Sequence, residues 1–399
     1  MPLMRRRGLS VTELKRLHSL DATRGIAALA VVLWHWQHVY SIGGGKLEDR
    51  TIQPFYAILF PFYENGWLAV EFFFTLSGFV FFWLYGKKIS EKSLGFGSFW
   101  LARFSRLYPL HFIMLLAVTA MQVTLLANNQ QSFIYGGTNV TNFVLNLFFL
   151  QYFSPGWSFN GPEWSVGVEI VLYALFFLYC RLLKPHWQVP LLACTLLGIV
   201  VMSQEWALGR GVIGFFAGGF AYEAWRRMRD KPFLTPFVRP LMVFVALAWI
   251  YCIFEIRTHT LTEWLDSFGM RGWFWVEMSF RVLLVPLTVL ALALHESHGA
   301  KFWQKISPLG DLTYALYLLH FPMQLAMALA VVLWGVPLAP LQSPLGMVVF
   351  FAVLIALSIA SYNWIERPAQ NWIRDRFSAR RGSAEKTGAG VAGAKTPAE

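Results

Sequence analysis

Long apolar runs separated by short polar loops cover most of the 399-residue chain. An α-helix rises about 1.5 Å per residue, so about 20 apolar residues cross the hydrocarbon core of a bilayer, which is about 30 Å thick. Ten runs reach this length, although the fifth is marginal, and they lie at 20–40, 66–86, 107–127, 164–183, 188–204, 208–225, 240–256, 273–294, 312–335 and 344–364. The pattern predicts an all-α polytopic membrane protein with about ten transmembrane helices.

An eleventh apolar run, from Asn142 to Phe153, has only twelve residues and is too short to cross a bilayer unaided. We expect it to form a short re-entrant or interfacial helix within a membrane domain at 20–377. The polar residues 1–19 are expected to form a cytoplasmic segment. Residues 378–399 are rich in Gly, Ala, Ser and Lys without an apolar period, which predicts a disordered cytoplasmic tail.

The basic residues are distributed unevenly between the two sides that ten crossings define. With a cytoplasmic N-terminus, the outer side holds only Lys46, Arg50, Arg210, Arg257 and Arg271. The remaining basic residues of the loops fall on the inner side, as the positive-inside rule requires. If the short run at 142–153 also crossed, every later basic loop would move outside. We therefore predict a bacterial inner-membrane protein with both termini in the cytoplasm.

Composition narrows the class of protein further. Only 14% of the residues are charged, against about 25% in soluble domains, so lipid is the expected surrounding of most of the chain. The net charge of +11 follows from the basic inner loops, and nucleic acid is not an expected partner. The three cysteines lie in apolar runs without CxxC spacing, so we expect neither a metal site nor a disulfide. Gly214 and Gly218 predict a close contact between two helices.

Two ionisable side chains share one face of the first apolar run. Arg24 and His35 are eleven residues apart, which places them about 20° apart around a helix and about 16 Å apart along it. Ionisable groups are expensive inside a membrane, so each is a functional candidate. The separation is of the order of the extended pantetheine arm of coenzyme A. An anionic head held near Arg24 would present a thioester near His35, which can act as a general base on a hydroxyl.

A carboxylate that orients His35 must come from another helix, because Asp21 lies about 21 Å away along the same helix. Three carboxylates of other apolar runs lie at a matching depth: Glu71, Glu169 and Glu277. The last is followed one turn later by Arg281 and is expected to pair with it. Glu71 and Glu169 are therefore the candidate partners of His35.

Arg103 and Arg106 form a second basic element just before the third apolar run. They lie on one face of a short helix, and paired guanidinium groups suit phosphate. The alternative for these groups is structural. The arginines would then anchor the chain at the membrane surface, and His35 would bond a backbone carbonyl in the bundle.

The loop at 154–165 combines Trp, Asn, Ser and Glu without a basic residue. Aromatic faces and neutral polar groups suit a sugar, so Trp157, Asn160 and Trp164 are candidate acceptor-side residues. Because the chain has 18 Trp, the alternative is an aromatic belt at the membrane surface.

Four segments, in order along the chain, resemble the acyltransferase-3 family of integral membrane acyltransferases. They are Asp21-x-x-Arg24-Gly with His35, Glu71-Phe-Phe-Phe-Thr-Leu-Ser77-Gly-Phe79, Arg103-x-x-Arg106 before Tyr108-Pro109, and Trp164-Ser-Val-Gly-Val-Glu169 followed by Tyr173. A weaker fifth segment is Leu312-Thr-Tyr314-Ala-Leu-Tyr317-Leu-Leu-His320. Each segment alone is unspecific, but together they cover residues 20 to about 320.

The resemblance implies a ten-helix membrane enzyme that moves an acyl group, often acetyl, from cytoplasmic acyl-CoA to a hydroxyl of a carbohydrate or glycolipid. Residue by residue, it implies a catalytic base at His35, donor-site residues at Arg24, Arg103 and Arg106, and active-site or acceptor-side residues at Glu71, Trp164 and Glu169. Acyl-CoA is then a cosubstrate, and no bound cofactor or metal is expected.

A protein of a different class would also place ionisable groups inside the membrane. In a secondary transporter, the same His, Arg and Glu side chains would bind a substrate or a coupling ion. We detect no inverted repeat, which weakens this alternative, whereas transport without acyl transfer would support it. A second family of membrane acyltransferases, which pairs a membrane His with a distant Asn or Asp, fits less well because the chain has no His-x-x-x-x-Asp element.

Overall fold

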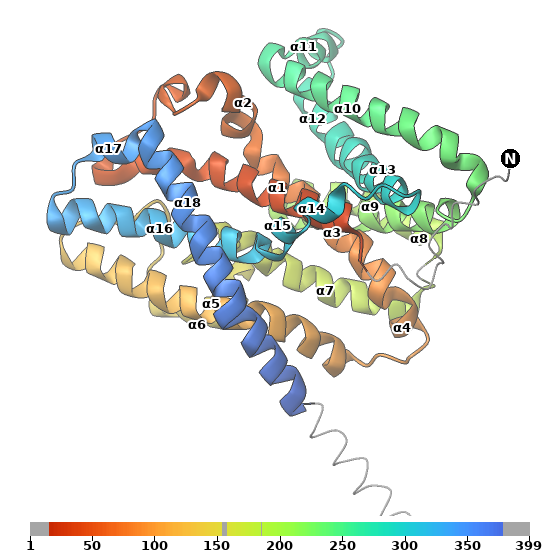
Figure 1. Ribbon diagram of the computed structural model, residues 1–399, viewed down its shortest axis with the longest axis horizontal. Coiled ribbons are helices and arrows are strands. Elements are labelled where there is room, and N and C mark those ends of the chain that lie inside the picture. The colour runs from red at the N-terminus through yellow and green to blue at the C-terminus, as the bar shows by residue number, and fades with distance from the viewer. Residues whose placement is uncertain (1–15, 154–157, 185, 378–399) are drawn as a thin grey trace, which may run out of the picture.

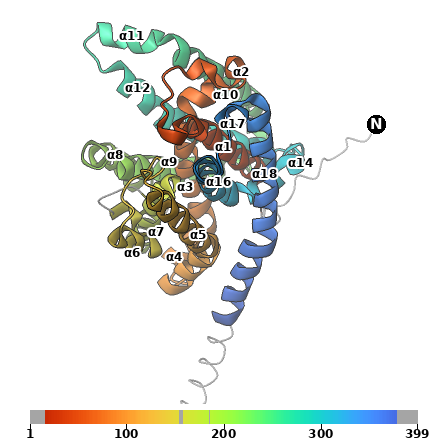
Figure 2. The same cartoon turned by 90° about the vertical axis from the view of Figure 1, so that its left-hand side faces the viewer.

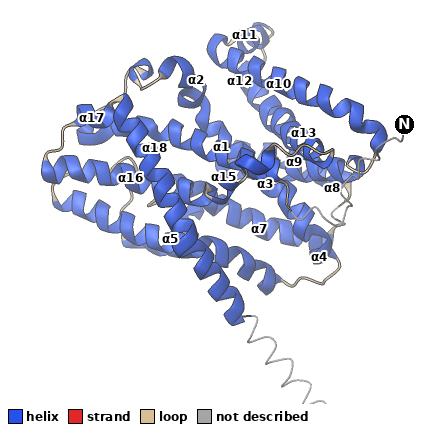
Figure 3. Ribbon diagram, in the orientation of Figure 1, coloured by secondary structure: helices blue, strands red, loops and turns tan. Residues whose placement is uncertain are grey.

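The computed structural model describes residues 16–153, 158–184 and 186–377. Helices are the only regular elements in these ranges, which contain no strand (Figures 1 and 3). The body of the molecule is formed by α1 His18–His35, α3 Ala69–Phe81, α5 Phe96–Ala127, α7 Trp164–Leu182, α8 Gln188–Gln204, α9 Trp206–Met228, α10 Thr235–Thr258, α13 Val285–Ser297, α16 Thr313–Trp334 and α18 Pro344–Ser361. The predicted all-α fold class is confirmed.

Shorter helices connect these elements. The α-helical ones are α2 Tyr56–Asn65, α4 Lys87–Ser90, α6 Val140–Leu147, α11 Thr260–Ser267, α12 Gly272–Ser279, α14 Trp303–Ile306, α15 Pro308–Asp311 and α17 Leu338–Gln342. Short 3-10 helices lie at Trp36–Gly44, Arg50–Ile52, Gly66–Leu68, Gln151–Phe153, Gly161–Glu163 and Pro232–Leu234. π-Helical stretches at Phe82–Gly86, Phe280–Leu284 and Tyr362–Glu366 continue α3, α12 and α18.

Seven continuous helical segments of the described chain are long and apolar enough to cross a membrane. They are Tyr56–Ser90, Phe96–Ala127, Gly161–Leu182, Pro232–Thr258, Gly272–Ser297, Thr313–Trp334 and Pro344–Phe377. The apolar side chains of Pro232–Thr258 are mostly exposed, which is expected of a helix that faces lipid. The chain is therefore a multi-pass membrane protein.

The other three predicted spans are also helical, but they are shorter or more polar. α8 has 17 residues, and α1 and α9 carry charged side chains such as Arg24 and Arg210. Length and composition therefore identify seven spans, and the total of ten stays a prediction. In the short run at 142–153, α6 has eight residues and is about 12 Å long. It is too short to cross a bilayer, as predicted.

α1 lies in the middle of the bundle and packs against α3, α13, α15 and α16 (Figure 1). Arg24 lies near its beginning and His35 is its last residue. We name the two ends of the bundle the arginine end and the histidine end accordingly. α18 crosses the outside of the bundle, and its continuation to Phe377 extends past the other helices (Figure 2).

Glycines bring α3 and α9 into close contact. A Cβ atom added at Gly218 would lie 1.9 Å from the carbonyl oxygen of Thr75, and one added at Gly78 would lie 1.8 Å from that of Phe215. Gly214 faces the same contact one turn earlier on α9. The close helix contact predicted from Gly214 and Gly218 is therefore confirmed. It fixes the position of α3, which carries Glu71 and Ser77.

Candidate active site

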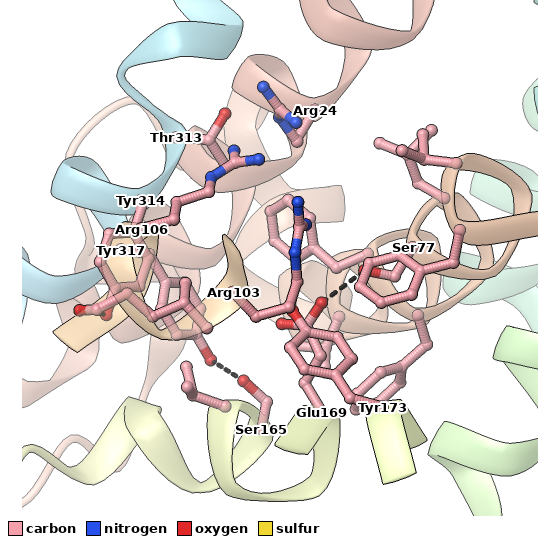
Figure 4. A pocket seen from close by; sticks show the side chains of 18 residues that line it. Arg24, Ser77, Arg103, Arg106, Ser165, Glu169, Tyr173, Thr313, Tyr314 and Tyr317 are labelled. Atoms are coloured by element: carbon pink, nitrogen blue, oxygen red, sulfur yellow. Dashed lines mark hydrogen bonds between the residues drawn. The ribbon is translucent and has the colours of Figure 1, made fainter. Parts of the chain in front are cut away.

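A cavity lies between α1, α3, α5, α7 and α16 (Figure 4). Its lining includes the three arginines predicted for a donor site, Arg24 on α1 and both Arg103 and Arg106 on α5. Figure 4 shows their guanidinium groups gathered around one space. Glu169 is the only acidic side chain in the lining. We call this space the arginine cavity.

Neighbouring groups hold the side chains of Arg24 and Arg103 in place. Arg24 forms an ion pair with Asp21 at 3.1 Å and donates a hydrogen bond of 2.8 Å to the carbonyl oxygen of Gly310. Arg103 is buried and donates to the hydroxyl of Tyr85. The Nε atoms of both arginines are buried without a partner. Both side chains are therefore fixed in position and still have donors free for an anion.

Arg106 has the fewest direct contacts of the three. It has neither a hydrogen bond nor an ion pair to any residue that the structure describes, although it interacts electrostatically with Glu366 of a neighbouring cavity. Three guanidinium groups face a single carboxylate in the cavity lining, and Asp21 pairs with one of them from outside it, so the cavity keeps an excess of positive charge. Inside a helical bundle, where the dielectric constant is low, such an excess favours a bound anion.

The one carboxylate of the cavity is engaged by a serine. The hydroxyl of Ser77 on α3 donates to Oε1 of Glu169 on α7 (Figure 4). Tyr173, one turn after Glu169 on α7, lines the same wall. Glu169 therefore lies in the arginine cavity and, among the described residues, forms no hydrogen bond with His35.

A second cavity adjoins the first at the arginine end. The two share Arg24, Arg106 and Tyr314 in their linings. Its remaining charged residues are Arg16, Asp21, Asp311, Glu366 and Arg367. Arg24 and Arg106 thus lie between two adjoining cavities.

His35 meets two other histidines at the far end of α1. Its Nδ1 lies 3.1 Å from Nε2 of His320 on α16, and the two ring centroids are 4.9 Å apart with an angle of 25° between the ring planes. The ring of His38 lies 5.0 Å away. The amide of Gln324, one turn after His320, donates to the carbonyl oxygen of His35 at 2.9 Å. Both Arg24 and His35 therefore contact the α15–α16 segment, as the predicted shared face requires.

Tyr317 connects the arginine cavity with the histidines. It lines the cavity, and its ring centroid lies 6.0 Å from that of His320 on the same helix. Its hydroxyl donates to the carbonyl oxygen of Pro162 at 2.6 Å and lies 2.7 Å from the hydroxyl of Ser165. The histidine pair therefore lies about one helical turn beyond the end of the arginine cavity.

Glu71 lies in a buried ionic cluster away from His35. Its Oε1 is 2.5 Å from Nε of Arg210 and 3.3 Å from Nε of Arg281. Arg281 also pairs with Glu277 at 2.7 Å, so the pair predicted from the i+4 spacing is confirmed. Trp164 packs on the same cluster, with its ring centroid 5.3 Å from the guanidinium of Arg210. We call Glu71, Arg210, Arg281 and Glu277 the ionic cluster.

Asn160 is held against α16 because a proline frees a backbone carbonyl. Pro322 lies inside α16 and has no N–H group to donate to the carbonyl of Leu318, one turn earlier. The side-chain amide of Asn160 donates to that carbonyl at 3.0 Å instead. Asn160 is therefore bonded to a residue of α16, Leu318, that precedes His320 by two positions. Trp157 lies outside the described residues.

Several residues of the site do not follow from sequence spacing. Arg210 and Arg281 fall inside predicted spans, so the rule on charges inside membranes could have found them. Arg210 is buried in α9, not in an outer loop. His320 stands in the fifth segment of the family resemblance but had no role assigned. His38 also falls inside a predicted span, so the same rule could have found it. Only the packing of α1 on α16 brings Gln324 to His35.

Comparison with known proteins points to one family. A family model described as an acyltransferase domain matches residues 17–363. The acyltransferase MdmB of Streptomyces mycarofaciens is 31% identical over 178 residues, which cover 42% of this chain and 40% of that protein. The exopolysaccharide production protein ExoZ of Rhizobium meliloti is 26% identical over 344 residues, which cover 82% of this chain and 94% of that protein.

A third relative has a more specific name. The peptidoglycan O-acetyltransferase OatA of Listeria monocytogenes is 24% identical over 341 residues, which cover 77% of this chain and 49% of that protein. The chain thus spans less than half the length of MdmB and OatA. No solved structure matches the chain.

Proposed function

The chain belongs to the acyltransferase-3 family, and from this premise we propose that it transfers an acyl group, acetyl in the simplest case, from acyl-CoA to a hydroxyl of a carbohydrate or glycolipid. Support for a saccharide acceptor comes from two relatives, whose names refer to peptidoglycan and to exopolysaccharide. The arginine end faces the cytoplasm in this proposal, because the basic loops lie on that side. The acceptor then approaches from the histidine end.

The observation that carries the proposal is the arginine cavity. Coenzyme A is a polyanion, and Arg24, Arg103 and Arg106 offer it three guanidinium groups opposed by one carboxylate. Arg106 has no hydrogen bond or ion pair in the described chain, and guanidinium groups bind phosphate oxygens strongly. The adjoining second cavity provides room for the nucleotide part of the donor.

His35 supplies the general base in this mechanism. A thioester held by the arginine cavity extends along α1 toward His35, which lies about 16 Å farther along the helix. As the acceptor oxygen forms a bond to the thioester carbonyl carbon, its proton passes to Nε2 of His35. The carbon–sulfur bond then breaks, and the coenzyme A thiolate leaves and takes up the proton from His35, which restores the neutral base. The products are an O-acyl ester and free coenzyme A.

Release of coenzyme A from acetyl-CoA by the purified protein in detergent, with a panel of saccharide acceptors, tests the proposal. His35→Ala should lower kcat by about 10²–10⁴-fold, the usual contribution of a general base. Arg103→Ala should mainly raise KM for acyl-CoA, by about tenfold or more, because hydrogen bonds to charged groups contribute about 1.5–3 kcal/mol.

Arg257→Ala is the matched arginine control, because Arg257 packs on Phe60 and lines neither cavity. It should leave both constants unchanged. A wild-type protein that neither binds nor consumes any acyl-CoA, while a transport assay responds to His35→Ala and Arg103→Ala, would contradict the proposal and favour a transporter.

A further inference from the structure

We propose that His320 is a positioning residue that fixes the tautomer of His35, so that Nε2 of His35 is the nitrogen that takes up the acceptor's proton. The inference rests on the proposed role of His35 as general base. The partner of the base is then a histidine of α16, whereas the sequence analysis predicted a carboxylate from another helix. The geometry that supports it is a short chain of hydrogen bonds ending at a backbone carbonyl.

The direction of these hydrogen bonds follows from the groups that can only accept. Nδ1 of His320 lies 3.2 Å from the carbonyl oxygen of Leu316, which has no proton to give. In neutral His320 the proton is therefore on Nδ1, and Nε2 carries a lone pair. That Nε2 lies 3.1 Å from Nδ1 of His35, so His35 donates its Nδ1 proton there. The other nitrogen of neutral His35, Nε2, is then free to accept a proton.

Both rings are expected to be neutral in the resting protein. His320 is fully buried, and no carboxylate of the described residues forms an ion pair with it or with His35. A buried imidazolium without a counter-charge is unfavourable. A neutral pair in which each ring has one donor and one acceptor nitrogen satisfies the contact between the two rings. The backbone of Val31, one turn before His35 on α1, is a second hydrogen-bond partner of the His35 ring.

A second hydrogen-bond chain holds His35 from the backbone side. The amide nitrogen of Gln324 donates to the carbonyl oxygen of His35 at 2.9 Å, which fixes the orientation of that amide. Its oxygen therefore faces Nδ1 of His38 at 3.1 Å, and His38 donates to it. The Nε2 of His38 is then also unprotonated, so His38 offers no proton that would occupy Nε2 of His35. His320 and Gln324, one turn apart on α16, thus hold the ring and the backbone of His35.

This arrangement has a consequence for the reaction. Where a catalytic imidazole is held in the wrong tautomer, the rate falls by about 10⁴-fold. When Nε2 of His35 takes up the proton of the acceptor hydroxyl, the hydrogen bond from its Nδ1 to His320 becomes charge-assisted and stronger. His320 then stabilises the imidazolium in the place of Glu71, which lies in the ionic cluster, and of Glu169, which lies in the arginine cavity.

The test compares His320→Gln with His320→Met, two side chains of similar length and volume. The glutamine oxygen can accept the Nδ1 proton of His35, whereas the methionine sulfur is a weak acceptor. We expect His320→Gln to keep kcat within about tenfold of wild type, the scale of one hydrogen bond. His320→Met should lower kcat by about 10²–10⁴-fold, with KM for acyl-CoA unchanged in both variants.

His320→Asn is a third variant, because its shorter amide reaches Leu316 but not His35, and it should behave like His320→Met. Melting temperature and elution volume in detergent establish that each variant is folded. Equal kcat of the folded glutamine and methionine variants, or a loss that falls on KM for acyl-CoA, would overturn the proposal. Failure of the proposed function itself is distinguishable, because wild type would then release no coenzyme A.

Discussion

Arg106 stands at the boundary of two cavities with no described hydrogen bond or ion pair, and this makes it the residue on which donor selection depends most. Arg24 lines the same two cavities but forms an ion pair with Asp21 at 3.1 Å. Less of its positive charge is therefore available to a ligand. A guanidinium without a direct ion pair in a low-dielectric bundle attracts a polyanion and gives no advantage to a neutral sugar. We therefore expect the arginine cavity to favour an anionic ligand over a neutral one.

Glu71 is expected to act on stability. Glu71→Gln removes the counter-charge that Arg210 and Arg281 share. Breaking a buried ion pair by removing one partner costs about 3–5 kcal/mol, because the other charge is left uncompensated. We expect a clear fall in the melting temperature of the detergent-solubilised protein, measured by circular dichroism, with kcat of the folded fraction retained.

The matched control is Glu277→Gln. Glu277 pairs with the same Arg281, but its side chain is 27% exposed against 1% for Glu71, so water can replace the lost partner. The melting temperature of Glu277→Gln should therefore fall much less than that of Glu71→Gln. A Glu71→Gln protein with unchanged melting temperature and abolished kcat would instead assign Glu71 to the reacting groups.

At the scale of single residues, the sequence predicts which arginines gather at one cavity more readily than which side chain contacts His35. Arg24, Arg103 and Arg106 are charged groups at the ends of apolar runs, and their helices meet at one cavity. His320 lies 285 residues from His35 along the chain, and depth alone cannot distinguish it from Glu71 or Glu169. Helix azimuth and packing decide which side chain faces His35, and a single sequence does not contain them.

At the scale of elements, α16 organises the histidine end. Its residues His320 and Gln324 contact His35, and its interruption at Pro322 frees the carbonyl of Leu318 for Asn160. The same proline therefore leaves a carbonyl to which the loop that precedes α7 is bonded. A helix without this proline would satisfy its own carbonyl and leave Asn160 without a partner.

A double-mutant cycle tests this coupling. Asn160→Ala leaves the carbonyl of Leu318 buried and unsatisfied, which costs about 1–3 kcal/mol, so the melting temperature should fall. Adding Pro322→Ala restores a backbone N–H group that can donate to Leu318. The double variant should therefore melt above Asn160→Ala. If the stability lost in the double variant equals the sum of the losses in the two single variants, Asn160 and Pro322 act independently.

The elements themselves are largely predictable. The apolar runs give the positions of the main helices, and Gly214 with Gly218 gives the contact between α3 and α9. The number of crossings is harder to predict, because α9 is buried in the bundle and can carry Arg210 without facing lipid. Its sequence is accordingly less apolar than that of the lipid-facing α10.

At the scale of the whole molecule, the two ends of the bundle carry different chemistry. The arginine end has two connected cavities and the excess positive charge, whereas the histidine end has the neutral histidines and the loop that carries Asn160. α1 spans the distance between them with Arg24 and His35 on one face. In the proposed function, the donor and the acceptor therefore reach the protein from opposite sides of the membrane.

Sealed membrane vesicles of opposite orientation test this central claim most directly. Acyl-CoA is added only outside the vesicles, which contain the natural acceptor, and release of coenzyme A is followed for wild type and Arg106→Ala. The account predicts release from inside-out vesicles, none from right-side-out vesicles until they are permeabilised, and a higher KM for acyl-CoA with Arg106→Ala. Release from sealed right-side-out vesicles would contradict it, because the donor would then enter from the histidine end.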